Sequence, residues 1–149
     1  MKSLFITENY NEILNRIKTL DENSKPIWGK MDVAQMLSHC AGPLQVSLEK
    51  LTLKKPNVLL RMLLSLFKSS LYNDKPWKHG LTTAKEYRVV VPKQFNTEKA
   101  KLLGLVEEFY AKKEQSIWPS HPYFGDFSKE QWGKMQYKHL DHHLNQFGK

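Results

Sequence analysis

Hydrophobic residues recur with the period of an α-helix over four long stretches of the chain. Apolar side chains spaced three and four apart form one face of such a helix, which then packs against a core. In the first stretch, residues 7–20, that face consists of Tyr10, Ile13, Leu14, Ile17 and Leu20. Thr7 stands where a capping side chain is expected. We predict that the first helix begins there and ends before the polar segment 21–26.

The second stretch begins at Asp32, which we predict to cap a helix. Its apolar stripe is long and continuous: Val33, Met36, Leu37, Cys40, Leu44, Leu48 and Leu51. Pro56 ends this helix at the latest. Pro43 lies four residues after His39, so its ring opposes the carbonyl of that residue. An irregularity of the helix around His39 is therefore expected.

A long connection separates the second helix from the third. Its first part, Val58–Phe67, holds eight apolar residues in ten, which is too short to cross a bilayer. A lid and a subunit contact that forms a homodimer are two functional interpretations. The broad apolar circumference instead favours simple packing over the end of the helices. Because Lys54, Lys55 and Lys68 flank the segment, peripheral membrane contact is a third interpretation.

The rest of the connection is irregular and rich in Pro, Asn, Gly and Thr. Tyr87–Val91 has the composition of a strand, but a single extended segment cannot build a sheet. We therefore predict a strap that crosses the helices. Asn96 or Thr97 is expected to cap the third long helix, which ends by Trp118-Pro119. The following residues, His121–Gly125, form a turn.

The fourth helix has the clearest boundaries. Ser128 is followed three residues later by Gln131, the spacing of a capping box, and Gly148 marks the end. Four helices of comparable length with no sheet predict an all-α fold. We expect an antiparallel four-helix bundle with a long elaborated connection between the second and third helices. A chain of 149 residues fits one domain, residues 1–149.

Composition narrows the classes of function. The net charge is +8, but the basic residues are nearly all lysine and are scattered among acids, so we expect no nucleic-acid partner. The N-terminal segment lacks an apolar core of signal-peptide length. The single cysteine, Cys40, excludes an intrachain disulfide. These features predict a cytoplasmic protein with no integral membrane association.

Residues 121–149 carry four of the six histidines. His139 and His143 lie about 40° apart around a helix, which lets two imidazoles share one metal ion. His142 points about 100° away from His143, so these two adjacent rings cannot easily serve the same ion. A pairing of His139 with His142, three residues apart, ranks second. Leu140 stands where the HExxH motif requires Glu. Since two imidazoles seldom hold a divalent ion tightly, a third ligand must come from elsewhere.

Three motifs resemble the DinB-like superfamily. They are Met36-Leu37-Ser38-His39, His121-Pro122-Tyr123-Phe124-Gly125 and His139-Leu140-Asp141-His142-His143-Leu144-Asn145-Gln146. The last is similar to the HxxHHxxQ pattern of that superfamily, and the HPxFG turn suggests a particular branch. The resemblance covers nearly the whole chain. It implies a four-helix bundle that holds a divalent metal on three histidines, here His39, His139 and His143.

Three neutral imidazoles leave an ion its full charge and an open position, as is typical of catalytic sites. Zinc is the default ion, and nickel, iron and copper accept the same ligands. Trp132, Gln136 and Gln146 fall on the same side of the helix as the histidine pair. They are expected near the pocket, in its wall or in the layer behind. His142 is a candidate proton shuttle at the rim, although a solvated position is favoured.

We therefore expect a metal-dependent enzyme that acts on a small-molecule substrate. Thiol-dependent S-transferases and hydrolases both occur in the resembling superfamily, which implies that the ion activates water or a low-molecular-weight thiol. The alternative is a non-catalytic protein, metal-binding or stress-related, that dimerises through Val58–Phe67. Cys40 is expected to be a small core residue. His79 and His121 are expected at the surface or in turns.

Overall fold

The computed structural model describes residues 2–81 and 85–149. In this part of the chain there are five α-helices, two short 3-10 helices and no strand, which confirms the all-α class. The α-helices are α1 (Thr7–Lys18), α2 (Val33–Ser47), α3 (Val58–Ser65), α4 (Phe95–Ala111) and α5 (Lys129–Gln146). The 3-10 helices are η1 (Lys68–Leu71) and η2 (Lys85–Tyr87). Four α-helices were expected, and the additional one is α3, within the long connection.

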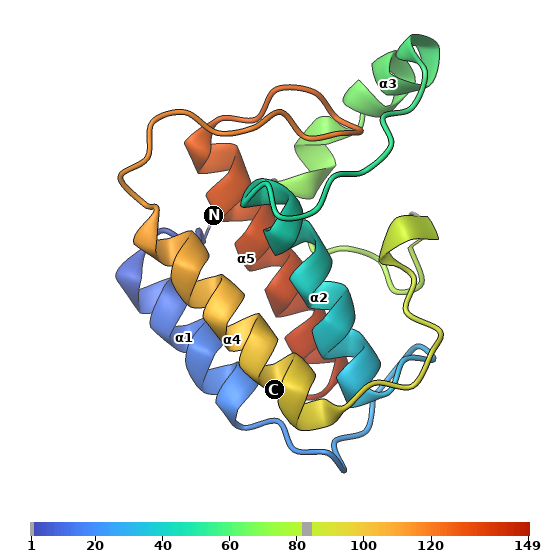
Figure 1. Ribbon diagram of the computed structural model, residues 1–149, viewed down its shortest axis with the longest axis vertical. Helices are drawn as coiled ribbons and strands as arrows, with labels where there is room; N and C mark the ends of the chain where they lie inside the picture. Colours follow the sequence, from blue (N-terminus) through green and yellow to red (C-terminus); the bar gives the residue numbers. More distant parts are fainter. Residues whose placement is uncertain (1, 82–84) are drawn as a thin grey trace.

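Four of the α-helices lie side by side (Figure 1). α1 packs against α4 and α5, and α2 packs against the same two helices. Their inward faces form a common core of almost fully buried side chains that includes Ile13, Ile17, Leu37, Phe109, Leu140 and Leu144. Full burial of one such side chain contributes roughly 1.5–3 kcal/mol. This core therefore holds α2 and α5, which carry the histidine motifs, in fixed positions.

Side-chain caps set the start of two helices. The Asp32 carboxylate accepts the backbone N–H of Gln35 at 2.8 Å, and the Gln35 amide oxygen accepts the backbone N–H of Asp32 at 3.1 Å. Ser128 and Gln131 form the same capping box at the start of α5. Both caps are as predicted, because the required side chains lie within one helical turn of each other.

Two other predicted caps are wrong. The residues that precede α1 and α4 make no capping hydrogen bond through their side chains. The Thr7 hydroxyl instead lies 2.8 Å from the Tyr110 hydroxyl and links α1 to α4. Asn96 and Thr97 lie inside the first turn of α4, and this helix ends at Ala111, short of its predicted end.

Helix α2 continues without interruption through Pro43 to Ser47. The irregularity predicted around His39 does not interrupt α2, and His39 lies within the helix. The carbonyl of Pro43 accepts a hydrogen bond from the side-chain amide of Gln136 at 2.9 Å. The chain leaves α2 earlier than its apolar pattern predicts, and Glu49 adopts a positive φ of 58° there.

Helix α3 projects from one end of the molecule (Figure 1). None of its residues is buried, and Val58 and Leu59 are 77% and 70% exposed. The expectation that this segment packs over the helix ends is therefore wrong. Only Arg61 and Leu64 are partly covered, because the apolar residues surround the helix and only one side of it can face the rest of the chain. No helix in the described ranges is long and apolar enough to span a bilayer.

Residues 85–91 cross α2, as the predicted strap does. Its first residues form η2, and residues 88–91 form neither a helix nor a strand. The Tyr87 ring lies over Gly42, where a β-carbon would come within 2.7 Å of the ring. The absence of a side chain at Gly42 therefore lets the strap approach the helix closely.

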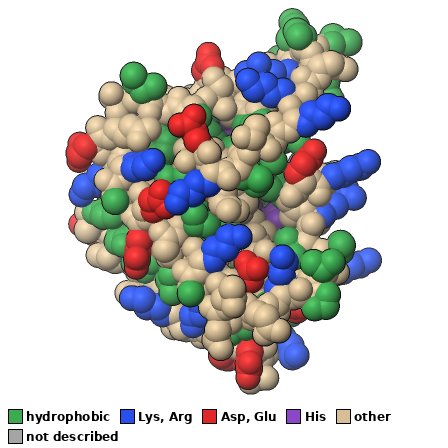
Figure 2. Space-filling model, viewed as in Figure 1, with side chains coloured by type: hydrophobic (Ala, Val, Ile, Leu, Met, Phe, Trp, Pro, Cys, Tyr) green, Lys and Arg blue, Asp and Glu red, His purple; other side chains and the backbone are tan. Residues whose placement is uncertain are grey.

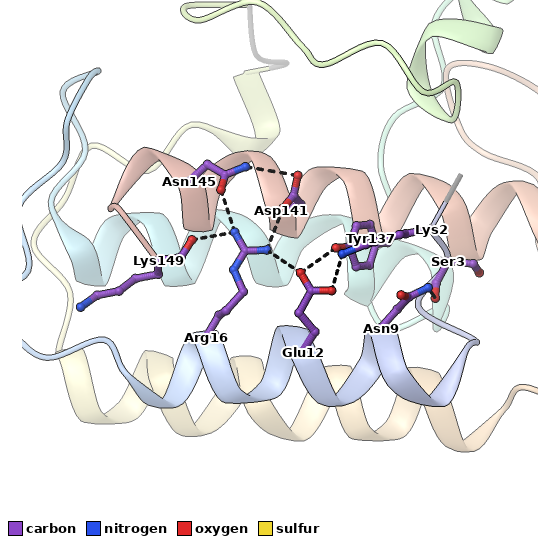
Figure 3. A network of polar contacts seen from close by, with 9 residues as sticks. All are labelled: Lys2, Ser3, Asn9, Glu12, Arg16, Tyr137, Asp141, Asn145 and Lys149. Carbon is purple, nitrogen blue, oxygen red and sulfur yellow. Dashed lines mark hydrogen bonds and ion pairs between the residues drawn. The ribbon is translucent and has the colours of Figure 1, made fainter.

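An ion-pair network fixes the rotation of α5 against α1 (Figure 3). The Arg16 guanidinium donates to the Asp141 carboxylate at 2.7 Å and to the Asn145 side-chain oxygen at 2.9 Å. The Tyr137 hydroxyl donates to the Glu12 carboxylate at 3.0 Å. Residues two positions further along a helix lie about 200° around it. Because Tyr137 and Asp141 face α1, the residues two positions after them, His139 and His143, point toward α2.

Candidate metal centre

Three buried histidines meet between α2 and α5. His39 comes from α2, and His139 and His143 lie one turn apart on α5. One ring nitrogen of each lies within 4.8 Å of the others, and the side chains are 6%, 6% and 9% exposed. The structure thus brings together the three residues named from sequence as metal ligands.

Hydrogen bonds determine which nitrogen of His39 can bind an ion. Its Nδ1 lies 2.8 Å from the backbone carbonyl of Tyr87, which can only accept. Nδ1 therefore carries the proton of the neutral ring, and the Nε2 lone pair faces the other histidines. The strap residue Tyr87 thus orients His39, a candidate ligand on α2.

His143 is oriented by a chain of two hydrogen bonds. The side-chain nitrogen of Gln146 donates to the backbone carbonyl of Trp28 at 2.7 Å. The Gln146 side-chain oxygen must then face His143, whose Nδ1 lies 2.8 Å away and donates to it. Nε2 of His143 is left as the free lone pair. Such outer partners are typical of histidines that bind metals.

The close approach of His39 and His139 fits a shared ion. Their Nε2 atoms are 3.1 Å apart. Because His39 offers a lone pair there, a proton or a cation must lie between the two nitrogens. Two imidazole ligands at metal–nitrogen distances of about 2.0–2.1 Å stand about 3.0–3.4 Å apart, depending on the coordination angle. His139 Nδ1 is buried without a hydrogen-bond partner among the described residues.

Burial keeps the three rings neutral. Desolvation, reinforced by His39, lowers the pKa of His143 to about 3. Desolvation also lowers the pKa of His39, and it holds the pKa of His139 well below its usual range with help from the neighbouring rings. Neutral imidazole is the form that binds a metal ion. No proton therefore competes strongly for these lone pairs at pH 7.

A cavity of about 740 Å³ opens beside the triad. Its wall is largely aromatic and apolar and includes Trp28, Met31, Leu64, Leu71, Trp77, Leu81, Tyr87, Tyr123, Phe124 and Met135. The three histidines of the triad line it, as do Gln146 and His142. His142 is half-buried, with Trp28 and Trp77 ring centroids 6.0 and 5.7 Å away. It therefore lies at the rim of the cavity, between solvent and the triad.

Two residues expected near the pocket lie behind its wall. Trp132 is fully buried, and its indole N–H donates to the carbonyl of Pro119 at 2.9 Å. Its ring stacks on that of His121, with centroids 5.4 Å apart. Gln136 is fully buried against α2 and supports Pro43, which lines the cavity. Both precede His139 on the inner face of α5, at levels deeper in the core.

Of the three remaining candidate residues, His121 lies in a place that the sequence did not predict, and His79 and Cys40 lie where they were expected. His121, expected at the surface or in a turn, lies in a turn but is only 5% exposed and lines the cavity. His79 is exposed, as expected, and stacks on Trp28 with centroids 3.8 Å apart. Cys40 is a core residue, and burial raises the pKa of its thiol, so it is not an activated nucleophile. The aromatic residues that surround His121 in the sequence were the available sign that this histidine is buried.

The chain belongs to the family described as protein of unknown function DUF1569, whose model matches residues 2–149. It has no significant match among curated proteins or among solved structures. The match covers both helices that carry the triad, the strap and the HPxFG turn.

Proposed function

We propose that this protein is a metal-dependent enzyme in which His39, His139 and His143 hold one divalent ion. The observation that carries the proposal is the 3.1 Å approach of two Nε2 atoms. One of these atoms offers a lone pair because a backbone carbonyl fixes its ring. A second ring, His143, is fixed in the same sense by Gln146. A proton between the two Nε2 atoms would satisfy His39 alone, whereas a cation at the convergence point would be bound by all three rings.

The helical arrangement supports a place in the DinB-like superfamily. In this proposal α1, α2, α4 and α5 are the four helices of an antiparallel bundle, and α3 is an elaboration of the connection between α2 and α4. The ligands then come from the second and fourth helices of the bundle. Zinc is the favoured ion because imidazole suits it, and nickel, iron and copper accept the same set.

A bound ion would supply Lewis acidity and lower the pKa of a water or thiol at its open position. The remaining contributions belong to the chain. The aromatic wall excludes water and holds the apolar part of a small-molecule substrate. His142, at the rim, is placed to move a proton between the cavity and solvent. The reaction class is thiol-dependent transfer or hydrolysis, carried out in the cytoplasm.

Elemental analysis of untagged protein tests the metal site. We expect about one ion per chain in the parent protein and in His79→Ala, a surface histidine control. We expect loss of the ion in His39→Ala, His139→Ala and His143→Ala. An unchanged metal content in all three triad variants would remove the site.

Activity is tested separately with the metal-loaded protein. Candidate reactions are transfer of a small thiol to an aromatic halide and hydrolysis of activated esters. Turnover that disappears in His139→Ala and His143→Ala supports the enzyme. A full metal complement without turnover of any substrate class favours the alternative described next.

The exposed apolar helix α3 favours a second candidate, a non-catalytic metal-binding or stress-related interaction protein. In that case α3 pairs with α3 of a second copy in a homodimer. Leu59→Glu and Met62→Glu, at positions 70% and 64% exposed, would then abolish the dimer in sedimentation experiments. A monomer at all concentrations in the parent protein would dismiss this candidate.

A further inference from the structure

His121 presents a single hydrogen-bond donor to the cavity. Its Nδ1 accepts the backbone N–H of Tyr123 at 3.2 Å within the HPxFG turn. The ring is neutral at pH 7, because burial lowers its pKa to about 4. The one ring proton must then reside on Nε2. This N–H makes no hydrogen bond to any described residue, and the side chain, although only 5% exposed, lines the cavity.

The ring of His121 is held rigidly in this orientation. Trp132 stacks on it at 5.4 Å and an interplanar angle of 27°, and Phe127 lies 5.3 Å away. Phe124 meets its edge at 4.9 Å. A donor that is fixed in position, has no partner among the described residues and lines the cavity is available to a ligand that accepts from it. His121 is therefore placed to position a ligand.

The charges around the cavity favour an anion. Lys30, Lys75 and Lys78 line it, and no Asp or Glu is among its described lining residues. All three lysines are exposed at the rim. Figure 2 shows histidine in a recess of the surface, with Lys and Arg side chains projecting along the same edge of the molecule. An ion held by three neutral imidazoles would add further positive charge that nothing in the wall compensates.

We propose that the cavity binds a ligand with an anionic oxygen group on an apolar, aromatic-sized body, and that His121 Nε2–H donates to one of its oxygens. The rim lysines select the charge, and the wall that includes Trp28 and Trp77 covers the body of the ligand. This deepens the proposed function, since the ligand would be the substrate or co-substrate of the same site. The binding step itself requires only residues of the chain.

A matched pair of probes tests this inference. 2-Naphthoate and 2-naphthamide share size and shape but differ in charge. We would measure both by isothermal titration calorimetry against the full chain, metal-free and zinc-loaded. In the metal-free protein we expect 2-naphthoate to bind about tenfold more tightly, as a charge-assisted hydrogen bond provides. Equal affinities, or no binding of either probe to either form, would overturn the proposal.

Two substitutions of His121 separate a donor from a structural role. His121→Asn keeps an acceptor for the Tyr123 N–H and removes the donor at the Nε2 position. His121→Gln places an amide N–H near that position. We expect His121→Asn to weaken naphthoate binding about tenfold and naphthamide binding less, because the neutral amide oxygen accepts a weaker hydrogen bond than a carboxylate does. We expect His121→Gln to recover most of the loss. Equal weakening of both probes in both variants, with intact circular dichroism, would show a packing role only and overturn the inference.

Charge selection is tested at the rim. Lys75→Met with Lys78→Met should bring the naphthoate-to-naphthamide ratio toward one, whereas Lys54→Met, outside the cavity, should leave it unchanged. An unaltered ratio in the double variant would overturn the role of these lysines.

Metal content distinguishes the two proposals. A protein that holds zinc but shows no charge preference contradicts this inference alone, and one that prefers naphthoate but never holds metal contradicts the proposed enzyme alone.

Discussion

At the scale of single residues, the triad depends on partners that are not ligands. His143 is held by Gln146, which is held in turn by the backbone carbonyl of Trp28. Gly29 adds to this constraint, because a β-carbon there would lie 2.4 Å from the Gln146 side-chain nitrogen. The connection between α1 and α2 thus determines which nitrogen of His143 is free to face the other two histidines.

Replacing Gln146 by Leu should therefore weaken zinc binding without removing a ligand. We expect a loss of about 10- to 100-fold, the usual effect of deleting an outer hydrogen-bond partner of a metal-bound histidine. Competition with a chromophoric chelator measures the affinity. Gln94→Leu is the control, since Gln94 is exposed and makes no side-chain cap bond. Equal affinities in the two variants would contradict the proposed chain of hydrogen bonds.

Burial of His121 makes stability depend on pH. Its pKa is about 4 in the folded chain, against 6.5 when exposed, mainly because burial disfavours its charged form. Between those values the unfolded chain binds more protons. The free energy of unfolding therefore falls as the pH drops from 6.5 to 4, by up to about 3 kcal/mol from this residue. Above pH 6.5 the effect vanishes.

Urea denaturation of metal-free protein at pH 7 and pH 4.5 measures this effect. His121→Asn cannot titrate, so it should lose less stability between the two pH values than the parent protein does. The other buried histidines remain in both proteins and supply the common part of the decrease. A constant difference between parent and variant at both pH values would refute a titrating role for His121.

At the scale of elements, α5 contacts a different helix on each of two faces. Tyr137 and Asp141 face α1, while His139 and His143 face α2. Arg16 of α1 holds the first face in register through Asp141 and Asn145, as Figure 3 shows. A packing error on the α1 side would rotate the histidines away from α2.

Arg16→Met should consequently destabilise the fold and also weaken metal binding. We expect the free energy of unfolding to fall by about 1–2 kcal/mol, a modest value because Asp141 is partly exposed to solvent. Lys18→Met, on an exposed residue of the same helix, is the control. Urea denaturation gives the stability and chelator competition the affinity. An unchanged affinity alongside reduced stability would show that α5 keeps its rotation without Arg16.

The sequence predicts those elements whose determinants are local. The capping boxes at Asp32 and Ser128 each lie within one turn, so both helix starts were predictable. Thr7 failed as a cap because a hydroxyl on another helix, Tyr110, is its partner. The pair His139 and His143 follows from helical geometry alone. Tyr87 and His121 were missed because their roles depend on how loops cross α2 and α5.

At the scale of the whole molecule, apolar periodicity predicts the four packed helices but not the placement of α3. A segment that is apolar on all sides does not indicate which side is covered. In the structure its large side chains remain exposed, with Leu66 and Phe67 at 74% and 65%. The net charge of +8 opposes close approach of two copies at low ionic strength. Any self-association through α3 should therefore strengthen with added salt.

The triad also joins two helices that are far apart in the chain, α2 and α5. An ion bound to the folded chain alone stabilises it by RT ln(1 + [M]/Kd), about 4 kcal/mol at a thousandfold excess over Kd. For a domain of this size that corresponds to a rise of roughly 10 °C in Tm. We expect zinc to produce this rise in the parent protein and His139→Ala to abolish it. Magnesium, which prefers oxygen ligands, should leave Tm unchanged. A similar rise with zinc in the variant would mean that the ion binds elsewhere on the chain.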